Sequence, residues 1–490
     1  MAADKPPLDE PKLRQLIDSG HIDTVLVVFT DMQGRLAGKR IHAKHFVDEV
    51  LGHGTEACNY LLAVDVEMNT VAGYDISSWQ TGYGDFKLKP DLATLRPAPW
   101  LPSTAMVQCD LLWMDDQPVL QSPRQILRAQ VARAEAMGYS ALAGTELEFI
   151  VFEDSYEEAW NGGYRSMTPS SRFNVDYSIL GGSRVEPLLR DIRNAMYNAG
   201  LTVESAKGEC NLGQHEIAFK YDHVLRTADQ HSVYKTAAKE LAARHGKSLT
   251  FMAKYDAREG NSCHIHMSLR GPDGVDPVFA TTGPGGAPAW STVFTHFLGG
   301  VLNTLIDFTL LYAPNINSYK RFQPDSFAPT AVAWGLDNRT CALRVVGTGS
   351  GLRVENRLPG GDVNPYLALA GMLGGGLYGI EHQLQPGAGL IGNAYSLPSA
   401  TIPTRAQEMA ERGLAPGGIQ IWPLSQLGAE VYRVPTTLQE ARDLFAASPI
   451  ADAVFGPDVV KHYVHAADIE LTAHASVVSD WERFRGFERL

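Results

Sequence analysis

The sequence predicts an α+β fold with a small N-terminal domain and a larger C-terminal domain. Strands rich in β-branched residues carry acidic side chains, and amphipathic helices alternate with them along most of the chain. A proline-rich segment, residues 95–102, follows the first hundred or so residues, and such segments commonly connect domains. The length of 490 residues is ample for two or more domains.

The composition excludes several classes of protein. Hydrophobic residues make up 44% of the chain and charged residues 20%, which is typical of a globular protein. The 42 basic and 55 acidic residues give a net charge of -13, whereas a nucleic-acid-binding protein would have a basic surface. We therefore expect no nucleic-acid partner.

Cysteine usage and hydropathy indicate the compartment. The five cysteines are widely spaced and contain no C-x-x-C pair, so they predict no disulfide framework. Residues 1–10 are polar and lack the apolar core of an export signal. The longest uncharged run, residues 366–380, is shorter than the roughly 20 residues that span a bilayer, so it predicts a buried helix. These features favour a cytoplasmic protein without a membrane partner.

The N-terminal elements follow from β-branched runs and turn residues. A β-branched strand, Asp-Met-Gln-Gly turn chemistry and a returning strand predict a hairpin. A long irregular segment rich in Asp, Gly, Tyr and Ser predicts a functional loop. The expected elements are a helix at 13–20, strands at 24–30 and 35–41, a helix at 45–51, a loop at 64–89 and a linker at 95–102.

The C-terminal elements follow from hydrophobic periodicity and helix-capping residues. Ser122 and Pro123 are typical of a helix start, and Gly138 is typical of a helix end. The expected strands are 107–113, the acidic strand around 145–151, 214–221 and 260–269, and the expected helices are 122–137, 185–200, 231–245 and 291–311, with a Gly/Pro loop at 282–287.

Residues 260–269, G-N-S-C-H-I-H-M-S-L, combine a polar face with an apolar one. In a strand, successive side chains alternate between faces, so His264, His266 and Ser268 share one side. An isolated H-x-H is at least as often a hydrogen-bonded pair of histidines as a metal site. The same pattern recurs, however, in strands that carry Glu146 and Glu148, and Glu355 between two arginines. Since charges are rarely buried unpaired, these strands predict one shared site.

The donor types in this predicted site favour hard divalent cations. Carboxylates dominate, and they suit Mg²⁺ or Mn²⁺, with an imidazole still acceptable. Zinc held by Cys210, Cys263, His264 and His266 is the alternative, but adjacent strand residues point to opposite faces. Metals and arginines without a Walker loop indicate phosphoryl transfer. The acidic residues are Glu146, Glu148, Glu209, Glu216 and Glu355, and the arginines are Arg321, Arg339, Arg344, Arg353 and Arg357.

These motifs resemble the glutamine synthetase family and its γ-glutamyl-amine ligase branch. The resemblance covers nearly the whole chain and rests on T-E-L-E-F, E-C-N-L-G-Q-H-E, G-N-S-C-H-I-H-M-S-L, N-S-Y-K-R-F, N-R-T-C-A-L-R and R-V-E-N-R-L-P, in family order. It implies an N-terminal helix at residues 1–20, a β-grasp domain at 21–105, and a catalytic domain at 106–490 with a curved antiparallel sheet. It also implies a homo-oligomer, a dodecamer of two hexameric rings whose active sites are shared between neighbours.

The resemblance also implies roles for individual residues. The metal nearer the substrate would bind Glu148, Glu209 and Glu216, and the metal at the ATP phosphates would bind Glu146, His264 and Glu355, which makes two or more Mg²⁺ or Mn²⁺ per site. Around ATP the resemblance places Glu204, His266, Ser268, Arg339, Arg344 and Arg353, and around glutamate it places Gly260, Arg321 and Arg357. The implied catalytic residues are Arg321, Arg339, Arg357 and Asp75.

Three departures from the family pattern concern the amine. Phe327 stands where a glutamine synthetase has a flap glutamate that takes a proton from ammonium. The ammonium-site motif reads Y-D-I-S-S, which keeps the acid as Asp75 but lacks a glycine. The expected Asn-Gly pair before the histidine strand reads Glu259-Gly260.

These departures favour a ligase that joins glutamate to an organic primary amine through γ-glutamyl phosphate. An aromatic ring at position 327 covers the carbon stem of an amine, and only Asp75 and Asp325 are available for a polyamine tail, so ethanolamine or a similar monoamine is favoured. A ligase of this kind implies a role in amine catabolism and nitrogen metabolism. The alternatives are a glutamine synthetase that uses ammonia and a non-catalytic regulatory oligomer. Tyr395 resembles a tyrosine that some relatives adenylylate.

Overall fold

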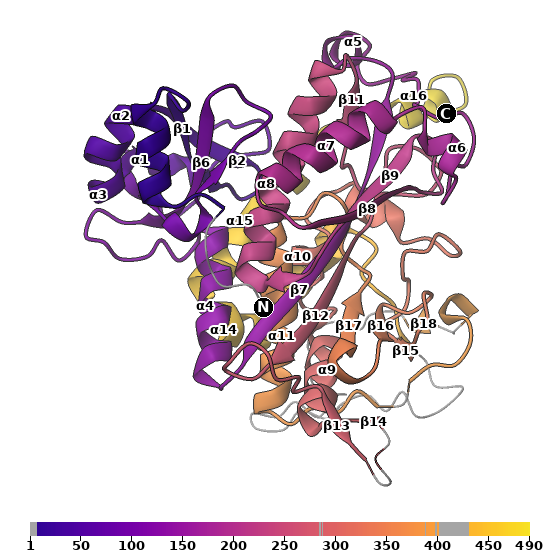
Figure 1. The fold of residues 1–490 in the computed structure, drawn as a ribbon. Helices are drawn as coiled ribbons and strands as arrows, with labels where there is room; N and C mark the ends of the chain where they lie inside the picture. Colours follow the sequence, from indigo (N-terminus) through magenta and orange to yellow (C-terminus); the bar gives the residue numbers. More distant parts are fainter. Residues whose placement is uncertain (1–6, 284–285, 287, 388, 397–398, 401–430) are drawn as a thin grey trace.

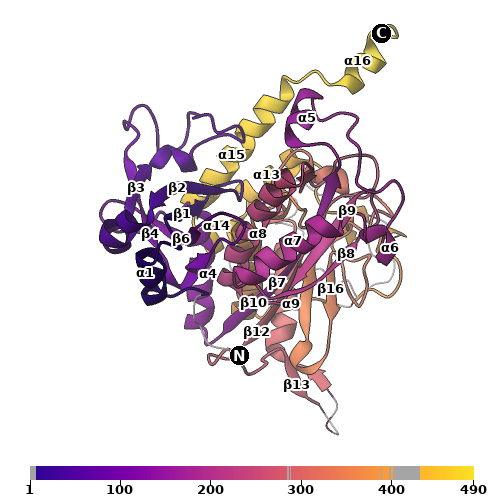
Figure 2. The ribbon, with the colours of Figure 1, turned by 45° about the horizontal axis from the view of Figure 1, so that its top comes forward.

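A computed structural model describes residues 7–283, 286, 288–387, 389–396, 399–400 and 431–490. Figure 1 shows the N-terminal sheet beside a larger body, and Figure 2 shows the last helix extending away from that body. Among the described residues, we find no helix with the length and hydropathy that a membrane span requires.

The N-terminal sheet is built around strand β1. Its sequence, TVLVVFT, is β-branched and buried over six of its seven residues. β1 forms the predicted antiparallel hairpin with β2 and pairs in parallel with β6. The described strand order is β2-β1-β6-β4-β3, with β5 on β6. The bounds are α1 (Glu10–Asp18), β1 (Thr24–Thr30), β2 (Leu36–His42), α2 (Ala43–His45), a π-helical turn (Phe46–Val50), α3 (Leu51–His53), β3 (Thr55–Cys58), β4 (Asp85–Pro90), β5 (Arg96–Pro97) and β6 (Thr104–Leu112).

The proline-rich segment is not a linker, and the predicted boundary at residue 105 falls within this sheet. β5 lies inside the segment and pairs with β6, and Ala98 and Trp100 are buried. The Trp100 indole donates to Glu240 at 2.6 Å, so the segment packs against the larger domain. β6 lies between β1 and β4, which makes it a central strand of the N-terminal sheet. The prolines correctly predict an irregular backbone, but the buried side chains next to them hold this segment against the N-terminal sheet. The loop predicted at 64–89 extends too far at its C-terminal end, because β4 begins at Asp85.

The larger sheet carries the acidic strands. Its described order is β15-β16-β17-β12-β7-β9-β8, and β10 and β11 also pair with β7. All described pairs of this sheet are antiparallel, as expected, except β15 with β16 at one edge, so the sheet is mixed. The bounds are β7 (Ser140–Phe152), β8 (Val203–Gly208), β9 (Gln214–Phe219), β10 (Asp222–His223), β11 (Ser248–Thr250), β12 (Cys263–Arg270), β15 (Trp334–Leu336), β16 (Leu343–Val346) and β17 (Arg353–Asn356). Two short pairs are β13 (Ala280–Thr282) with β14 (Pro288–Trp290), and β18 (Ser399–Ala400) with β19 (Val431–Tyr432).

Helices pack on this sheet and bury its apolar side chains. The predicted apolar run at 366–380 forms α11, which is buried along nearly its whole length against α9, α4 and α8. A Cβ on Gly379 would lie 2.4 Å from Gly300 Cα, so glycine permits the close contact of α11 with α9. The bounds are α4 (Pro123–Ala136), α5 (Tyr156–Asn161), α6 (Ile179–Gly182), α7 (Glu186–Asn198), α8 (Val224–Arg244), α9 (Thr292–Thr304), α10 (Thr309–Tyr312), α11 (Pro365–Glu381), α13 (Leu438–Ala446), α14 (Pro449–Phe455), α15 (Pro457–Ala475) and α16 (Asp480–Gly486).

The single long helix expected at 291–311 is two helices. α9 ends at Thr304 and α10 begins at Thr309. Asp307 lies buried between them and accepts a hydrogen bond from the Ser448 hydroxyl at 3.0 Å. A buried carboxylate needs such a partner, and this requirement interrupts the apolar run.

Candidate active site

Strand register brings the predicted site residues together on one face of the larger sheet. On the central strand β7, Glu146 lies opposite His264 of β12. Glu148, two residues further along β7, lies opposite Glu216 of β9. Residues two apart on a strand share a face, so the two glutamates of β7 serve two adjacent groups of side chains. On the other edge of β12, His266 lies opposite Glu355 of β17.

The first group, here called the carboxylate cluster, consists of Glu148, Glu209 and Glu216. One oxygen of each carboxylate lies within 4.8 Å of the others. Glu148 is held by the Ser262 backbone N–H at 2.7 Å and by the Gln214 amide at 3.2 Å. Burial, together with the neighbouring glutamates, raises the pKa of Glu216 to about 8 although Lys207 opposes that rise. The cations of the protein itself therefore do not suffice to keep all three carboxylates ionised.

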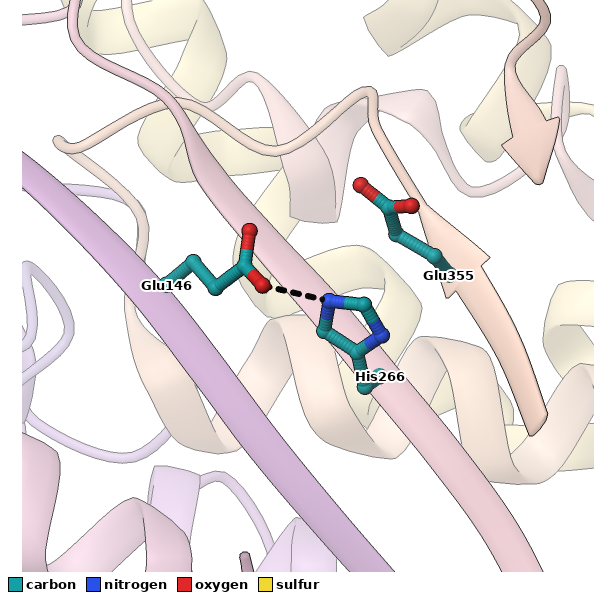
Figure 3. A group of neighbouring side chains, drawn as sticks. All are labelled: Glu146, His266 and Glu355. Atoms are coloured by element: carbon teal, nitrogen blue, oxygen red, sulfur yellow. Dashed lines mark hydrogen bonds and ion pairs between the residues drawn. The ribbon is translucent and has the colours of Figure 1, made fainter. Parts of the chain in front are cut away.

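The second group, here called the histidine cluster, consists of Glu146, His266 and Glu355, whose ligand atoms also lie within 4.8 Å of one another. Figure 3 shows the three side chains converging from three strands. The Glu146 carboxylate lies 2.9 Å from His266 Nε2. The predicted set had His264 in place of His266. His264 Nδ1 lies 3.3 Å from Glu146 and 3.6 Å from Glu355, so both histidines border the same carboxylates.

The charges around Glu355 keep it ionised. Its side chain is fully buried and accepts from Arg344 at 2.8 Å and from Arg357 at 2.5 Å. Burial alone would raise its pKa, but His264, Arg357 and the other nearby cations lower the pKa of Glu355 to about 2. Burial and the Arg357 charge lower the pKa of His264, although Glu146 and Glu355 oppose that change, and a lowered pKa favours the neutral imidazole that binds a metal.

The donor chemistry of both clusters fits hard divalent cations. Three carboxylates in one cluster, and two carboxylates with an imidazole in the other, are ligand sets that Mg²⁺ and Mn²⁺ accept. The zinc alternative is not supported in the described part of the chain. Cys263 is fully buried in the apolar core, on the opposite side of β12 from His264, and Cys210 groups with Asp176 and Glu209.

A cavity of about 290 Å³ adjoins the histidine cluster. Its lining includes four of the six residues predicted to contact ATP, together with Glu146; the four are Glu204, His266, Ser268 and Arg353. Arg353 Nε donates to His266 Nδ1 at 3.1 Å, which orients the imidazole toward Glu146. The two remaining predicted residues lie outside this lining. Arg344 bridges Asp337 and Glu355, and Arg339 is exposed on the loop between β15 and β16.

The residues predicted to contact glutamate do not line this cavity, but they adjoin the clusters. Arg321 is buried, and it donates to the Leu358 carbonyl at 2.8 Å and to Ser262 Oγ at 2.9 Å. A Cβ on Gly260 would lie 2.6 Å from Arg321 Cγ, so only glycine allows this approach. Arg357 is also buried and links Glu355 to the backbone of Phe327.

Phe327 and Asp75, which were predicted to contact the amine, have different surroundings in this chain. Phe327 is 56% exposed and has a φ of 60°, an unfavourable conformation for a non-glycine residue. Its carbonyl accepts from Arg357 at 3.4 Å, and the next carbonyl, that of Ala328, accepts from the Tyr395 hydroxyl at 2.9 Å. Asp75 instead pairs with Lys461 of α15 at 2.5 Å. Leu397 and Pro398, which complete the Tyr395 motif, are outside the described residues.

Two residues of the site were missed by the sequence analysis. Gln214 donates to Glu148, to the Gly260 carbonyl and to Asn261, and so ties the carboxylate cluster to the glutamate side. Lys207 contacts Glu209 and lies 3.7 Å from Glu216. The same spacing argument that found Glu146 and Glu148 applies to Lys207, which stands two residues before Glu209.

Comparison with known proteins agrees with this arrangement. The profile of the glutamine synthetase catalytic domain matches residues 120–412. The chain is 58% identical to the gamma-glutamylethanolamide synthetase GlnA4 of Streptomyces coelicolor over 99% of this chain and 97% of that protein. It is 36% identical to a glutamate–isopropylamine ligase of a Pseudomonas species over 97% of each.

A solved structure has the same fold. The structure described as a GmaS/ADP complex superposes with a TM-score of 0.78 at 26% sequence identity, over 97% of this chain and 99% of that one. The predicted resemblance is thereby confirmed along the full described length. With both donor clusters on one sheet face, and with these matches to its catalytic domain, this chain belongs to the glutamine synthetase family.

Proposed function

We propose that this protein is an ATP-dependent ligase that forms a γ-glutamyl amide from L-glutamate and a small organic amine, with ethanolamine as the favoured amine. The observation that carries the proposal is the arrangement of two donor clusters on one sheet face, next to a cavity of about 290 Å³ and near the buried Arg321 and Arg357. This arrangement suits phosphoryl transfer, in which catalysis consists mostly of positioning and charge stabilisation. Two relatives whose names specify organic amines support the choice of substrate class.

ATP and glutamate bind to different groups of residues next to the two clusters. ATP occupies the cavity lined by Glu204, His266, Ser268 and Arg353, while glutamate lies beside Gly260, Arg321 and Arg357. Two or more Mg²⁺ or Mn²⁺ ions, held by the two clusters, would supply charge neutralisation at the phosphates. The six predicted ligands are Glu146, Glu148, Glu209, Glu216, His264 and Glu355. Arg339 and Arg344 contact the phosphates, for which a rotation of Arg344 away from Asp337 is required.

The chemistry proceeds in two displacements. The γ-carboxylate of glutamate takes the terminal phosphoryl group of ATP and ADP leaves. The amine nitrogen then attacks the γ-carbonyl carbon, phosphate leaves, and the ammonium proton passes to a base or to water. Phe327 cannot take that proton, because an aromatic ring is not a base. Asp75 of a neighbouring subunit is the candidate group, since in its own chain Asp75 pairs with Lys461 and belongs to neither cluster.

An amine panel tests the substrate. Phosphate release with glutamate, ATP and Mg²⁺ should show a higher kcat/KM for ethanolamine than for ammonium. Each methylene that packs against Phe327 contributes about 0.8 kcal/mol, so the two methylenes of ethanolamine correspond to roughly a 15-fold preference. Spermine and spermidine should be poor substrates, because carboxylates near the loop are few.

Two variants at position 327 sharpen this test. Phe327→Glu should shift the ratio toward ammonium by about tenfold or more, because it restores a proton acceptor and removes the apolar cover. Phe327→Leu keeps an apolar side chain and should retain the preference for ethanolamine. If the unaltered protein makes glutamine from ammonium faster than any amide from an organic amine, the glutamine synthetase alternative holds instead.

The oligomeric state and the cellular compartment are part of the same proposal. We propose a dodecamer of two hexameric rings, which would allow Asp75 of one subunit to reach a neighbour's site. Mass photometry should then detect a species of about twelve subunits, since shared sites tie catalysis to the oligomer. A fully active monomer would contradict this. The five free cysteines suit a reducing cytoplasm, where we place the enzyme in amine catabolism and nitrogen metabolism.

A further inference from the structure

Lys207 is a basic residue inside the carboxylate cluster, and nothing in the proposed reaction uses it. On β8 it lies directly opposite Glu216 of β9. Its ammonium contacts Glu209 and lies 3.7 Å from Glu216, so it reaches two of the three cluster members. The lysine side chain is 23% exposed, whereas Glu209 and Glu216 are 15% and 7% exposed. Lys207 therefore competes for the same oxygens that a metal ion would use.

A segment of irregular backbone covers this lysine. The Tyr177 backbone N–H donates to the Gly208 carbonyl at 3.3 Å, and a Cβ on Gly208 would lie 2.4 Å from the Val175 carbonyl oxygen. The Cys210 thiol lies 3.4 Å from the Asp176 carboxylate. These contacts fasten residues 175–177 over the end of β8 and the residues that follow it.

The Tyr177 ring lies beside the Lys207 ammonium while that ammonium contacts Glu209. The Lys207 ammonium is 5.0 Å from the centre of the Tyr177 ring, within the range of a cation–π contact. That ring is 73% exposed, so the space on its outer side is open to solvent. A flexible lysine stem can carry its charge from the carboxylates to the ring without movement of the backbone.

We propose that Lys207 is an internal competitor for the metal nearer the substrate: its ammonium occupies the carboxylate cluster in the metal-free enzyme and moves over Tyr177 when a divalent cation binds. The physical reason is like-charge repulsion, because an ammonium and a divalent cation that share Glu209 and Glu216 repel each other across a few ångströms of partly buried space. Lys207 compensates part of the cluster charge before the metal arrives and lowers the affinity of the cluster for the metal. This inference rests on the proposed function, since it takes the carboxylate cluster as a metal site.

Mn²⁺ binding, followed by electron paramagnetic resonance of the free ion, tests the proposal without an activity assay. In Lys207→Met the dissociation constant of one class of Mn²⁺ site should fall by about tenfold or more, since the competing charge is gone. The class that belongs to the histidine cluster should keep its affinity. Lys207→Arg, which retains the charge, should stay within about threefold of the unaltered protein. Lys220→Met removes an exposed lysine just after β9 and should change neither class.

A double-mutant cycle tests the movement over Tyr177. Tyr177→Ala removes the ring and should weaken Mn²⁺ binding about two- to fivefold, as expected from the strength of an exposed cation–π contact. The same change in the Lys207→Met background should leave the Mn²⁺ affinity unchanged, because no ammonium is then present to contact the ring. Circular dichroism of each variant checks that its fold is retained.

The outcomes separate this inference from the proposed function. Glu216→Gln identifies the class of Mn²⁺ site that belongs to the carboxylate cluster. If that class exists and Lys207→Met leaves its affinity unchanged or weaker, the competitor role is wrong while the metal site stands. If Glu216→Gln removes no class of Mn²⁺ site, the metal assignment itself is wrong, and the inference falls with it.

Discussion

Replacing Glu216 or Glu209 by alanine is expected to lower kcat for glutamate phosphorylation by at least about 10²–10³-fold. Each substitution removes one of three carboxylates whose oxygens lie within 4.8 Å of one another. The remaining two carboxylates hold a hard divalent cation weakly, and the phosphate charge that develops during transfer then has less compensation. Production of ADP from ATP and glutamate measures this loss.

Two further measurements complete the test: activity in excess chelator, and activity after substitution of a glutamate that belongs to neither cluster. Excess chelator should abolish the activity of the unaltered protein, and added Mg²⁺ or Mn²⁺ should restore it. Glu153→Ala is the matched control, because Glu153 follows β7 directly but pairs with Lys247 at 2.5 Å and belongs to neither cluster. It should retain nearly full activity. Full activity of the unaltered protein in excess chelator would contradict the assignment of the clusters as metal sites.

Arg124→Ala is expected to destabilise the protein by about 3–5 kcal/mol, because it leaves a buried carboxylate without its ion-pair partner. Arg124 is 2% exposed, and its guanidinium donates to both oxygens of Asp229 at 2.9 Å. It also donates to Asp110 at 2.6 Å and to Asp91 at 2.8 Å, both in the N-terminal part of the chain. The Tyr366 hydroxyl of α11 donates to Asp229 Oδ1 of the same network at 2.6 Å. One guanidinium thus joins the two domains.

The neighbouring arginine provides a matched control for this prediction. Arg128 pairs with the same Asp91 and Asp110 at 2.6 and 2.9 Å, but its side chain is 37% exposed. Arg128→Ala should therefore cost no more than about 1 kcal/mol. The shift of the urea midpoint measures both variants. Adding Asp229→Asn to Arg124→Ala should recover part of the loss, since it removes the unpaired charge. Equal losses for the two arginine variants would show that burial of the pair is not the cause.

The sequence predicted those elements whose pattern is local. β1 has the predicted bounds, α4 and α11 agree within about one residue, and the alternation of polar and apolar residues along β12 is as expected. Predictions failed where a distant contact decided the backbone. The proline-rich segment became part of the N-terminal sheet because β6 pairs with β5 and Trp100 packs on α8. The apolar run at 291–311 broke because Asp307 required a partner from a serine far along the chain.

The sequence by itself determined which residues are candidates for the chemistry of this protein. Residue types and spacing placed acidic, histidine and arginine side chains on the same faces of short strands, because the period of a strand is a local property. Their resemblance to one family supplied the reaction class. The aromatic residue at position 327 favoured an organic amine over ammonium.

Only the tertiary structure decided which of these side chains meet. Register between β7, β9, β12 and β17 pairs Glu148 with Glu216, sets His266 beside Glu355, and places Lys207 opposite Glu216. Register depends on the fit of all side chains on both faces of the sheet, and a slip of one residue would move every ligand to the wrong face. A property of the whole sheet cannot be read from any single strand, and for this reason the contacts of Lys207 with Glu216 and of Gln214 with Glu148 followed only from the tertiary structure.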